Sequence, residues 1–237
     1  MATPLFFVIA RVVSRDGALE KWRKRLVGLC AVSKTEPYSN SYYWGHDLDG
    51  APDTLWGLEG YYHPVGFFMS HISSDTFKEE MKKVDEDKLL RNVQGLGSPD
   101  YDLHHYDESS GFVKRMDDAN ADCVDSAVVV VHFWAQEGRR KELLAVMADY
   151  ADKVKAREMS PSIDIQSFLA LKELNDLNLA SLYIRTRSRE DWDRFEGSSL
   201  YRELQEEVSA LITEQEIHRS QAFIGHIGQD APGGNPW

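Results

Sequence analysis

Hydrophobic residues gather in two similar stretches of the chain, each of which leads into a turn that ends at a glycine. Leu5 to Val13 is an almost unbroken apolar run before the polar turn 14–17, and Ala127 to Trp134 is a second such run before 135–138. Both runs are rich in β-branched and aromatic residues, which favour strands. The two glycines, Gly17 and Gly138, lie 121 positions apart. This correspondence predicts an internal repeat.

A helix is predicted after each of these glycines. Apolar residues recur there at intervals of three or four, the spacing of one helix face. They are Leu19, Trp22, Leu26, Leu29 and Cys30 in the first copy and Leu143, Leu144, Met147, Tyr150, Ala151 and Val154 in the second. Each helix is expected to end before Pro37 or Pro161, because the residue that precedes a proline is driven out of the α region.

Two strands, a second helix and a final strand complete each copy. The predicted strands are 41–46 and 54–61 in the first copy and 163–171 and 179–186 in the second, with turn-forming residues between them. A second apolar pattern of helical spacing follows, and the closing strands are predicted at 101–106 and 221–227. The apolar residues of that pattern are Phe67, Phe68, Ile72, Phe77, Met81 and Val84 in one copy and Trp192, Phe195, Leu200, Tyr201, Leu204, Val208 and Leu211 in the other.

The order βαββαβ, found twice, predicts an α+β fold made of two tandem ferredoxin-like repeats. Such a repeat places both helices on one face of an antiparallel sheet, so its other face must be buried against something else. We expect the two sheets to face each other across one apolar cavity. The predicted domains are 1–106 and 127–237, with a polar linker at 107–126 and an irregular tail from residue 229.

Composition excludes several classes of function. The formal net charge is −12, and 27 Lys and Arg residues are scattered among 39 acidic ones, which disfavours nucleic acid as a partner. No apolar run reaches the roughly 18 residues that a membrane-spanning helix needs. The start of the chain lacks a basic segment of the kind that opens a signal peptide, and two cysteines, Cys30 and Cys123, make no disulfide framework. These features favour a cytoplasmic protein.

Alternation along the first strand of each repeat identifies residues that point into the expected cavity. In the first copy Val8, Ala10 and Val12 form an apolar row toward the helices, which leaves Arg11 on the other side. In the second copy the same reasoning directs His132 and Trp134 into the cavity, and His132 matches Arg11 at the 121-residue offset. A basic group within an apolar strand is costly unless it meets a carboxylate, a ligand or water. Arg11 and His132 are therefore the leading candidate site residues.

Further residues of the middle strands are candidates for the same cavity. Glu59 is expected to lie beside Arg11, either as a structural ion-pair partner or as part of a site. In the second copy Ser181, Tyr183 and Arg185 are expected on the cavity side, with Arg185 near the place of Glu59. Other candidates are Gln166 and, from a dense set of aromatic residues that would otherwise be core, Tyr43 and Trp56.

His71 lies on the apolar side of the second predicted helix, where a hydrogen-bonded core histidine and a catalytic one are both possible interpretations. A histidine with a pKa near neutrality, His71 or His132, would be suited to remove a proton from an acidic phenol or an activated methylene. No metal is expected, because His104-His105 and the region of His46 lack the spaced partners of a metal site. The chain also lacks the glycine-rich fingerprints of nucleotide-binding folds.

The run Phe7-Val-Ile-Ala-Arg-Val-Val13, then Glu59-Gly-Tyr61, then His71 followed by Ser74 and Phe77, resembles the antibiotic-biosynthesis monooxygenase family. The resemblance covers residues 5 to 106, whereas the second copy departs from the pattern, with Arg185 near the glutamate and Phe195 near the histidine. It implies a dimeric α/β barrel, built here within one chain. The opening residues and the length are similar to those of angucycline B-ring-opening oxygenases of the jadomycin, gilvocarcin and kinamycin pathways.

The resemblance implies an oxygenase for an aromatic polyketide phenol or quinol, with O2 as cosubstrate and neither metal nor haem. Haem degradation is disfavoured because the first strand offers Arg11 where haem-degrading relatives carry asparagine. Some members of the group depend on reduced flavin, which would here be a diffusible reductant supplied by a flavin reductase. Arg11 or Arg185 would stabilise the developing charge. The alternatives are an anthrone-type oxygenase or cyclase and a non-catalytic small-molecule binding protein. A homo-oligomer is compatible with each of these functions.

Overall fold

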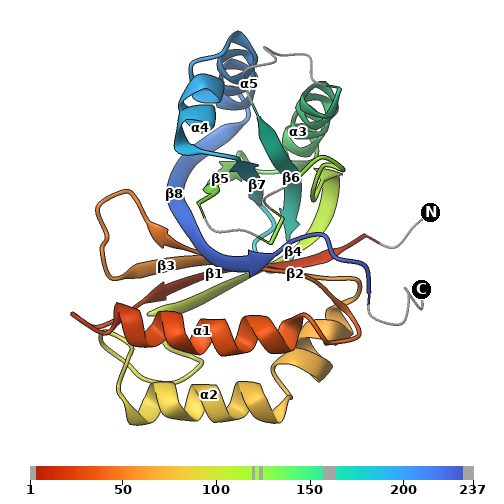
Figure 1. Cartoon of the computed structure of the whole chain (residues 1–237). Helices are drawn as coiled ribbons and strands as arrows, with labels where there is room; N and C mark the ends of the chain where they lie inside the picture. Colours follow the sequence, from red (N-terminus) through yellow and green to blue (C-terminus); the bar gives the residue numbers. More distant parts are fainter. Residues whose placement is uncertain (1–3, 119–120, 123–124, 157–163, 232–237) are drawn as a thin grey trace.

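The computed structural model describes residues 4–118, 121–122, 125–156 and 164–231. Over these residues the strands join into a closed antiparallel barrel in the order β1-β3-β2-β8-β5-β7-β6-β4 (Figure 1). The elements in chain order are β1 (Phe6–Val13), α1 (Leu19–Ser33), β2 (Ser39–Asp47), β3 (Thr54–Tyr61), a π-helical turn η1 (Gly66–His71), α2 (Asp75–Glu86), β4 (Tyr101–Phe112), β5 (Ala127–Ala135), α3 (Arg140–Lys155), β6 (Ile165–Glu173), β7 (Leu179–Thr186), α4 (Arg189–Glu196), α5 (Ser199–Ser209) and β8 (Ile212–His226).

The barrel consists of two halves with the same strand order. The first half has the order β4-β1-β3-β2 and the second the order β8-β5-β7-β6. The halves meet edge to edge, where β2 pairs with β8 and β4 pairs with β6. An α+β barrel built inside one chain is therefore confirmed. The two sheets do not stack as separate layers, because hydrogen bonds at both seams convert them into one closed sheet.

Both faces of this sheet are covered. Helices α1 and α2 lie outside the first half, and α3, α4 and α5 lie outside the second (Figure 1). Separate apolar clusters fill the two helix–sheet interfaces, and a third fills the barrel interior. Strands that are buried on both faces need apolar side chains at nearly every position. This explains why β1 and β5 are almost unbroken hydrophobic runs in the sequence.

The turns after β1 and β5 have the same backbone conformation in both halves. Gly17 has a φ of 73° and Gly138 a φ of 77°, a left-handed conformation that glycine adopts without steric cost. Each half enters its first helix through this turn. The glycine match that predicted the repeat therefore reflects a conformational requirement that both copies share.

Two closing strands are longer than the sequence predicted. β4 continues through Phe112, into the segment that was predicted as linker, and β8 begins at Ile212 rather than at residue 221. The added length of β4 pairs with β6 of the other half, and the added length of β8 pairs with β5 of its own half. These segments are polar, since one face is partly exposed, and their pairing partners are distant in sequence. Local patterns therefore did not identify them as strands.

The second predicted helix is broken in both halves. In the first half η1 is followed by α2, whose N-cap Ser74 accepts a hydrogen bond from the backbone N–H of Phe77. In the second half Ser198 caps α5 in the same way, through Tyr201, after α4 has ended. A serine hydroxyl that satisfies a free N–H group begins a new helix efficiently. The apolar spacing alone did not reveal these breaks.

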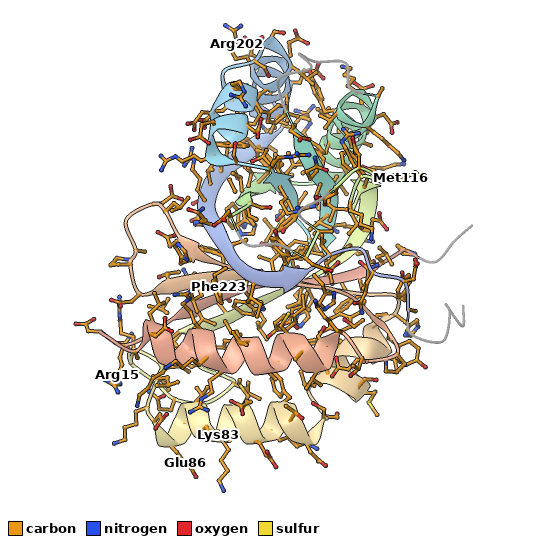
Figure 2. All side chains as sticks on the ribbon, in the orientation of Figure 1. Arg15, Lys83, Glu86, Met116, Arg202 and Phe223 are labelled. Carbon is orange, nitrogen blue, oxygen red and sulfur yellow. The ribbon has the colours of Figure 1, made fainter. Side chains whose placement is uncertain are left out.

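Charged side chains of the helices and of the turn before α1 project outward. Arg15, Glu86 and Arg202 are exposed at the periphery, while side chains fill the spaces between helices and sheet (Figure 2). Among the described residues no helix is both long and apolar enough to cross a membrane. Cys123, Pro161 and residues 232–237 of the predicted tail lie outside the residues that the structure describes.

We predict that Gly111→Ala destabilises the seam between the halves. Gly111 lies in β4 with a φ of 113°, and a Cβ there would overlap the backbone carbonyl oxygen of Phe168 in β6. The free energy of unfolding should fall by about 1 to 3 kcal/mol in urea titrations, as expected for backbone strain at a special φ.

Gly28→Ala is the matched control, because Gly28 lies within α1 and a Cβ there meets no heavy atom within 4 Å. That change should stabilise the protein slightly, by about 0.5 to 1 kcal/mol. Equal effects of the two substitutions would show that the seam tolerates a side chain at residue 111.

Candidate functional site

One end of the barrel holds a cavity of about 190 Å³. Both halves build it: β1, β3 and β4 contribute from the first and β5 and β8 from the second. Its walls combine charged, imidazole and indole side chains, a mixture that is typical of ligand sites. The lining residues are Ile9, Arg11, Trp56, Asp102, His104, His132, Trp134, Glu216 and His218.

His132 is buried in the wall of this cavity, and its hydrogen-bond partners allow one tautomer to be assigned. Its Nδ1 lies 2.8 Å from Oγ of Ser181, and Ser181 in turn donates to Oη of Tyr106 at 3.1 Å. The geometry directs the hydroxyl hydrogen of Ser181 to Tyr106, and on that basis Nδ1 of His132 is assigned as the donor in the first bond. The other ring nitrogen, Nε2, is left with a free lone pair. His132 can therefore accept a hydrogen bond or a proton.

The pKa of His132 is lowered to about 3, chiefly by burial and further by the neighbouring His218 and His104. The ring is therefore uncharged at physiological pH. The sequence allowed His132 to be a base with a pKa near neutrality. In the free protein His132 does not meet that condition. His132 is instead a permanently available acceptor, and it is best matched to a donor that is itself acidic.

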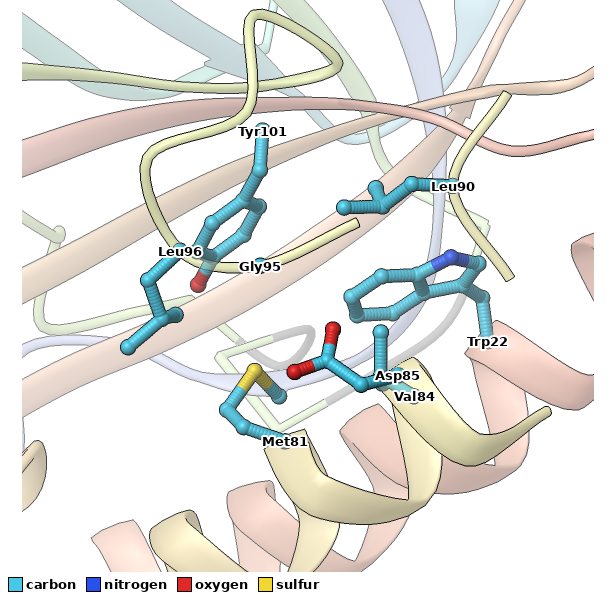
Figure 3. Close-up of a pocket in the computed structure, with 8 residues that line it drawn as sticks. All are labelled: Trp22, Met81, Val84, Asp85, Leu90, Gly95, Leu96 and Tyr101. Carbon is cyan, nitrogen blue, oxygen red and sulfur yellow. The ribbon is translucent and has the colours of Figure 1, made fainter. Parts of the chain in front are cut away.

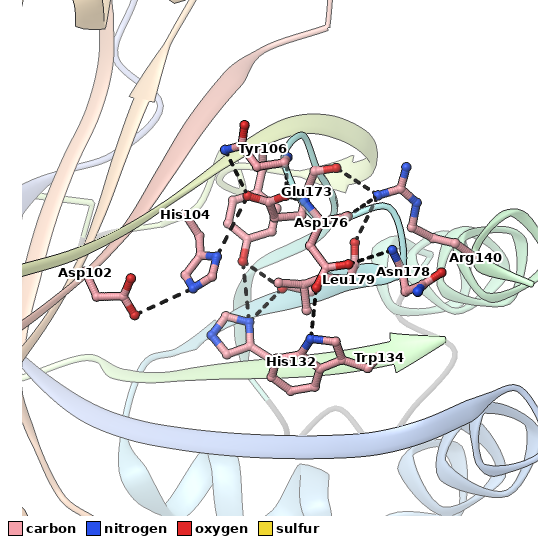
Figure 4. Close-up of polar contacts among 12 residues, drawn as sticks. Asp102, His104, Tyr106, His132, Trp134, Arg140, Glu173, Asp176, Asn178 and Leu179 are labelled. Atoms are coloured by element: carbon pink, nitrogen blue, oxygen red, sulfur yellow. Dashed lines mark hydrogen bonds and ion pairs between the residues drawn. The ribbon is translucent and has the colours of Figure 1, made fainter. Parts of the chain in front are cut away.

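A line of alternating charges runs along the first-half wall beside His132. Arg11 lies opposite Asp102 across the β1–β4 pair, with Nη2 and Oδ2 3.5 Å apart. His104 follows two residues later on the same face of β4. Its Nε2 lies 3.6 Å from Asp102, and its Nδ1 lies 3.8 Å from Glu173 (Figure 4). The contact with Asp102, and then the charge of Glu173, raise the pKa of His104.

Two tryptophans are fixed as aromatic walls. The indole N–H of Trp56 donates to Asp47 at 3.1 Å, and that of Trp134 donates to Asp176 at 3.1 Å. His218 stacks on Trp56, with ring centroids 4.1 Å apart and planes inclined by 24°. Because each indole is held at its polar end, the flat faces keep their orientation. A planar aromatic ligand would fit such walls.

Arg185 does not reach this cavity. It is fully buried in the barrel interior, where its guanidinium pairs with Asp118, donates to Ser167 and lies 5.4 Å from the ring of Tyr43. Tyr43 and Tyr183 belong to the apolar cluster between Arg185 and the cavity. The register places Arg185 opposite Val128 and Glu59 opposite Val8, so the two residues do not occupy matching places. The expectation that Arg185 would lie near the place of Glu59 was therefore wrong.

Glu59 lies on the opposite side of the sheet from the cavity. It is buried among the helix-facing residues, where Tyr61 donates to its carboxylate at 2.9 Å. The expectation that Glu59 would face the cavity beside Arg11 was therefore wrong, and Asp102 is the carboxylate that pairs with Arg11. In both halves the residues of the third strand that match Glu59 in parity face the helices, as Leu182 and Ile184 do.

His71 joins Glu59 in this buried cluster outside the barrel. Its Nδ1 lies 2.9 Å from Glu36, and its Nε2 lies 3.9 Å from Glu59. Burial alone would lower the pKa of His71, but the hydrogen bond with Glu36 and the charges of Glu59 and Glu36 raise it above its usual value. His71 does not line the barrel cavity. The geometry gives His71 a structural position between two carboxylates.

Gln166 also lies away from the cavity wall, where its side-chain amide donates to Asp164. Sequence reasoning missed Asp102, His104, Tyr106, Glu216 and His218. Asp102, His104 and Tyr106 alternate along β4, so parity could have found them once the inward face of that strand was chosen. Glu216 and His218 lie on the part of β8 that was not recognised as a strand.

Other hollows offer less chemistry. A void behind α2, between Trp22 and Tyr101, measures only about 10 Å³ (Figure 3). An open groove of about 450 Å³ follows the surface of α2 and is lined by apolar residues such as Phe77 and Met81 and by charged residues such as Lys82. Within the described ranges, no three His, Cys, Asp or Glu residues are grouped so that they could hold a metal ion.

Comparison with solved structures identifies proteins that share this fold. A protein from Fusobacterium nucleatum, provisionally named a monooxygenase, superposes with a TM-score of 0.78 at 9% sequence identity, over 96% of each chain. A protein from Lactobacillus acidophilus with the same provisional name gives 0.73 at 10% identity, over 95% of this chain and 97% of that one. An anthrone oxidase-like protein gives 0.63 at 10% identity, over 97% and 95%.

These likenesses extend over the whole chain and establish a shared barrel fold, at identities too low to carry a function with them. No protein-family model matches the sequence, and no curated protein matches it significantly. The fold class is therefore a single-chain α+β barrel of the kind found in these proteins. The chemistry must be argued from the cavity itself.

We predict that His71→Gln lowers stability in a pH-dependent way. The raised pKa of His71 in the folded protein stabilises it fully below the unfolded value of about 6.5, and this contribution is lost as the pH rises through the folded-state pKa. The difference in unfolding free energy between wild type and variant should therefore shrink in urea titrations as the pH rises above about 6.5.

His46→Gln is the control. The pKa of His46 is lowered by burial, so its ring is uncharged in both states above about pH 7, and its difference from wild type should stay flat there. A constant difference for His71→Gln over the same range would mean that His71 is uncharged in the folded protein.

Proposed function

We propose that this protein is an oxygenase that acts on an aromatic phenol or quinol in the cavity at the end of the barrel. The observation that carries the proposal is His132, whose Nδ1 proton is held by Ser181 so that the lone pair of Nε2 remains available between two fixed indole walls. A planar, electron-rich ring with an acidic hydroxyl group suits both features. The fold shared with proteins provisionally named monooxygenases is consistent with this reaction class.

The residues have distinct tasks in this proposal. Trp56 and Trp134 hold the ring, His132 accepts the hydroxyl or methylene proton, and Arg11 stabilises the negative charge that develops on oxygen. Nε of Arg11 is buried and has no hydrogen-bond partner within the described part of the chain, so a donor is available there. Because His132 has a low proton affinity, the best substrates are those with acidic protons, such as hydroxylated polycyclic rings.

Neither a metal nor a bound cofactor is needed to balance the reaction. A quinol and O2 give a hydroxyquinone and water, with all electrons supplied by the ring. An anthrone and O2 likewise give an anthraquinone and water. A cavity of about 190 Å³ is smaller than pockets that enclose drug-sized ligands, which begin at about 300 Å³. We therefore propose that the reacting ring enters while the remainder of a polycyclic substrate extends from the opening, and that a reduced flavin would act from solution.

The finer assignment is oxidation of an aromatic polyketide, including oxidative ring opening of an angucycline. Each half is then a ferredoxin-like repeat of the antibiotic-biosynthesis monooxygenase type, the second being degenerate. A cytoplasmic location, a flavin reductase as partner and a homo-oligomeric state remain part of this proposal. Arg185, which lies deeper in the barrel, is assigned to support of the cavity rather than to contact with substrate.

Oxygen consumption by the purified protein tests the proposal. Naphthalene-1,4-diol and 1,8-dihydroxyanthrone represent the quinol and the anthrone, and the spontaneous rate without protein is subtracted. Binding of either compound, followed by tryptophan fluorescence, with no O2 consumed above that rate would instead support the binding-protein alternative. Preference for one substrate would separate the quinol oxygenase from the anthrone oxygenase.

We predict that His132→Ala lowers turnover by about 10²-fold or more, the usual contribution of a positioned proton-transfer group. Water that enters the cavity can replace the imidazole as partner of Ser181, so the melting temperature should change little. His46→Gln, outside the cavity, should retain full turnover. Unchanged O2 consumption in His132→Ala would remove this residue from the mechanism.

A further inference from the structure

We propose that His104 is a second catalytic residue of the cavity, the proton donor that complements the acceptor His132. This inference rests on the oxygenase function proposed above. His104 lines the same cavity as His132, and the two ring centroids are 5.8 Å apart. Its side chain is 36% exposed, so a bound substrate can contact it. Two imidazoles thus face one ligand from different strands, β4 and β5.

The surroundings of His104 favour its charged form. Asp102 approaches Nε2 from the same strand, and Glu173 approaches Nδ1 from β6. Glu173 is itself anchored, because its carboxylate accepts the backbone N–H groups of Asn175 and Asp176. An imidazolium between two carboxylates is stabilised relative to the neutral ring.

The remaining groups that face His104 do not cancel this effect. Arg11, on β1, opposes the imidazolium but is itself paired with Asp102. Tyr106, on β4, and His132, on β5, contribute no charge at neutral pH, and Glu216 and His218 line the cavity from β8. The pKa of His104 is raised as a result, whereas that of His132 is lowered. Two neighbouring groups with opposed proton affinities are the usual arrangement of an acid and a base in one site.

The reaction of a quinol uses both groups. His132 takes a phenolic proton, and a ring carbon then bonds to O2, which is reduced to a ring-bound peroxide by electrons from the ring. His104 protonates the outer peroxide oxygen. The O–O bond then breaks as the C–H proton of the oxygenated carbon passes to His104, and the departing hydroxide takes the proton from His132. The products are a hydroxyquinone and water, and both histidines regain their starting states.

Loss of the donor should change the products as well as the rate. Without this donor the peroxide can instead leave the ring carbon as hydrogen peroxide, taking the proton held by His132 and that of the second phenolic hydroxyl, so that the quinol becomes a quinone instead of a hydroxyquinone. In His104→Gln we expect turnover with naphthalene-1,4-diol to fall about tenfold or more, within the range for general acid catalysis. The hydrogen peroxide released per O2 consumed should rise severalfold.

The pH profile supplies a second readout. Wild-type turnover should decline at alkaline pH as His104 loses its proton, and this decline should disappear in His104→Gln. Asp102→Asn keeps the imidazole but removes its main stabilising charge, so it should move the decline to lower pH. His105→Gln is the matched control, since His105 packs against Phe6 and Phe68 and is not part of the cavity lining. It should alter neither the product ratio nor the profile.

Nuclear magnetic resonance titration of the histidine rings tests the same assignment without turnover. His104 should titrate above the usual value of about 6.5, and His132 should not titrate between about pH 5 and pH 9. The proposal is overturned if His132 titrates above His104, or if folded His104→Gln keeps both the product ratio and the alkaline decline. If wild-type protein consumes no O2, the oxygenase function fails as well. If it consumes O2 and His104→Gln behaves as wild type, only the role of His104 fails.

Discussion

The pairing of strands between the two halves is the constraint on which the rest of the structure depends. β2 pairs with β8 and β4 pairs with β6, and these seams close the sheet. An open sheet would leave edge N–H and C=O groups unpaired and an apolar face in water. Closure pairs these backbone groups and buries the apolar face. It also brings five strands from the two halves around one cavity. A single repeat would contribute only part of the lining, either Ile9, Arg11, Trp56, Asp102 and His104 or His132, Trp134, Glu216 and His218.

Closure also divides the charged residues of the chain between two environments. Inside the barrel, Arg11, Asp102 and His104 lie at the open cavity, and the Arg185–Asp118 pair lies deeper within. Between them lie Tyr43, Tyr183 and other apolar residues. Outside the barrel, Glu36, His71 and Glu59 form a buried cluster beneath the helices. A buried charge needs a partner, and each of these groups has a carboxylate or a cation within reach.

The histidines illustrate how position decides the chemistry of one residue type. His132 is buried near other basic groups and has a lowered pKa, whereas His71 is even more deeply buried and has a raised one because two carboxylates adjoin it. Burial alone therefore does not predict the protonation state. The proposed division of work between His132 and His104 follows from the same difference, since of these two rings it is His104 that lies against the carboxylates of Asp102 and Glu173.

The sequence by itself determined the repeat, the α+β class and the inward direction of Arg11, His132 and Trp134. These depend on local properties: strand alternation, helical spacing and the left-handed glycines Gly17 and Gly138. Only the tertiary structure decided that Glu59 faces the helices, that Arg185 pairs with Asp118, and that Asp102 and His104 join His132. Those outcomes depend on strand register and on contacts between distant strands, such as β4 with β6. The sequence could not decide them, because a short stretch of sequence carries no information on which distant strand will pair with it.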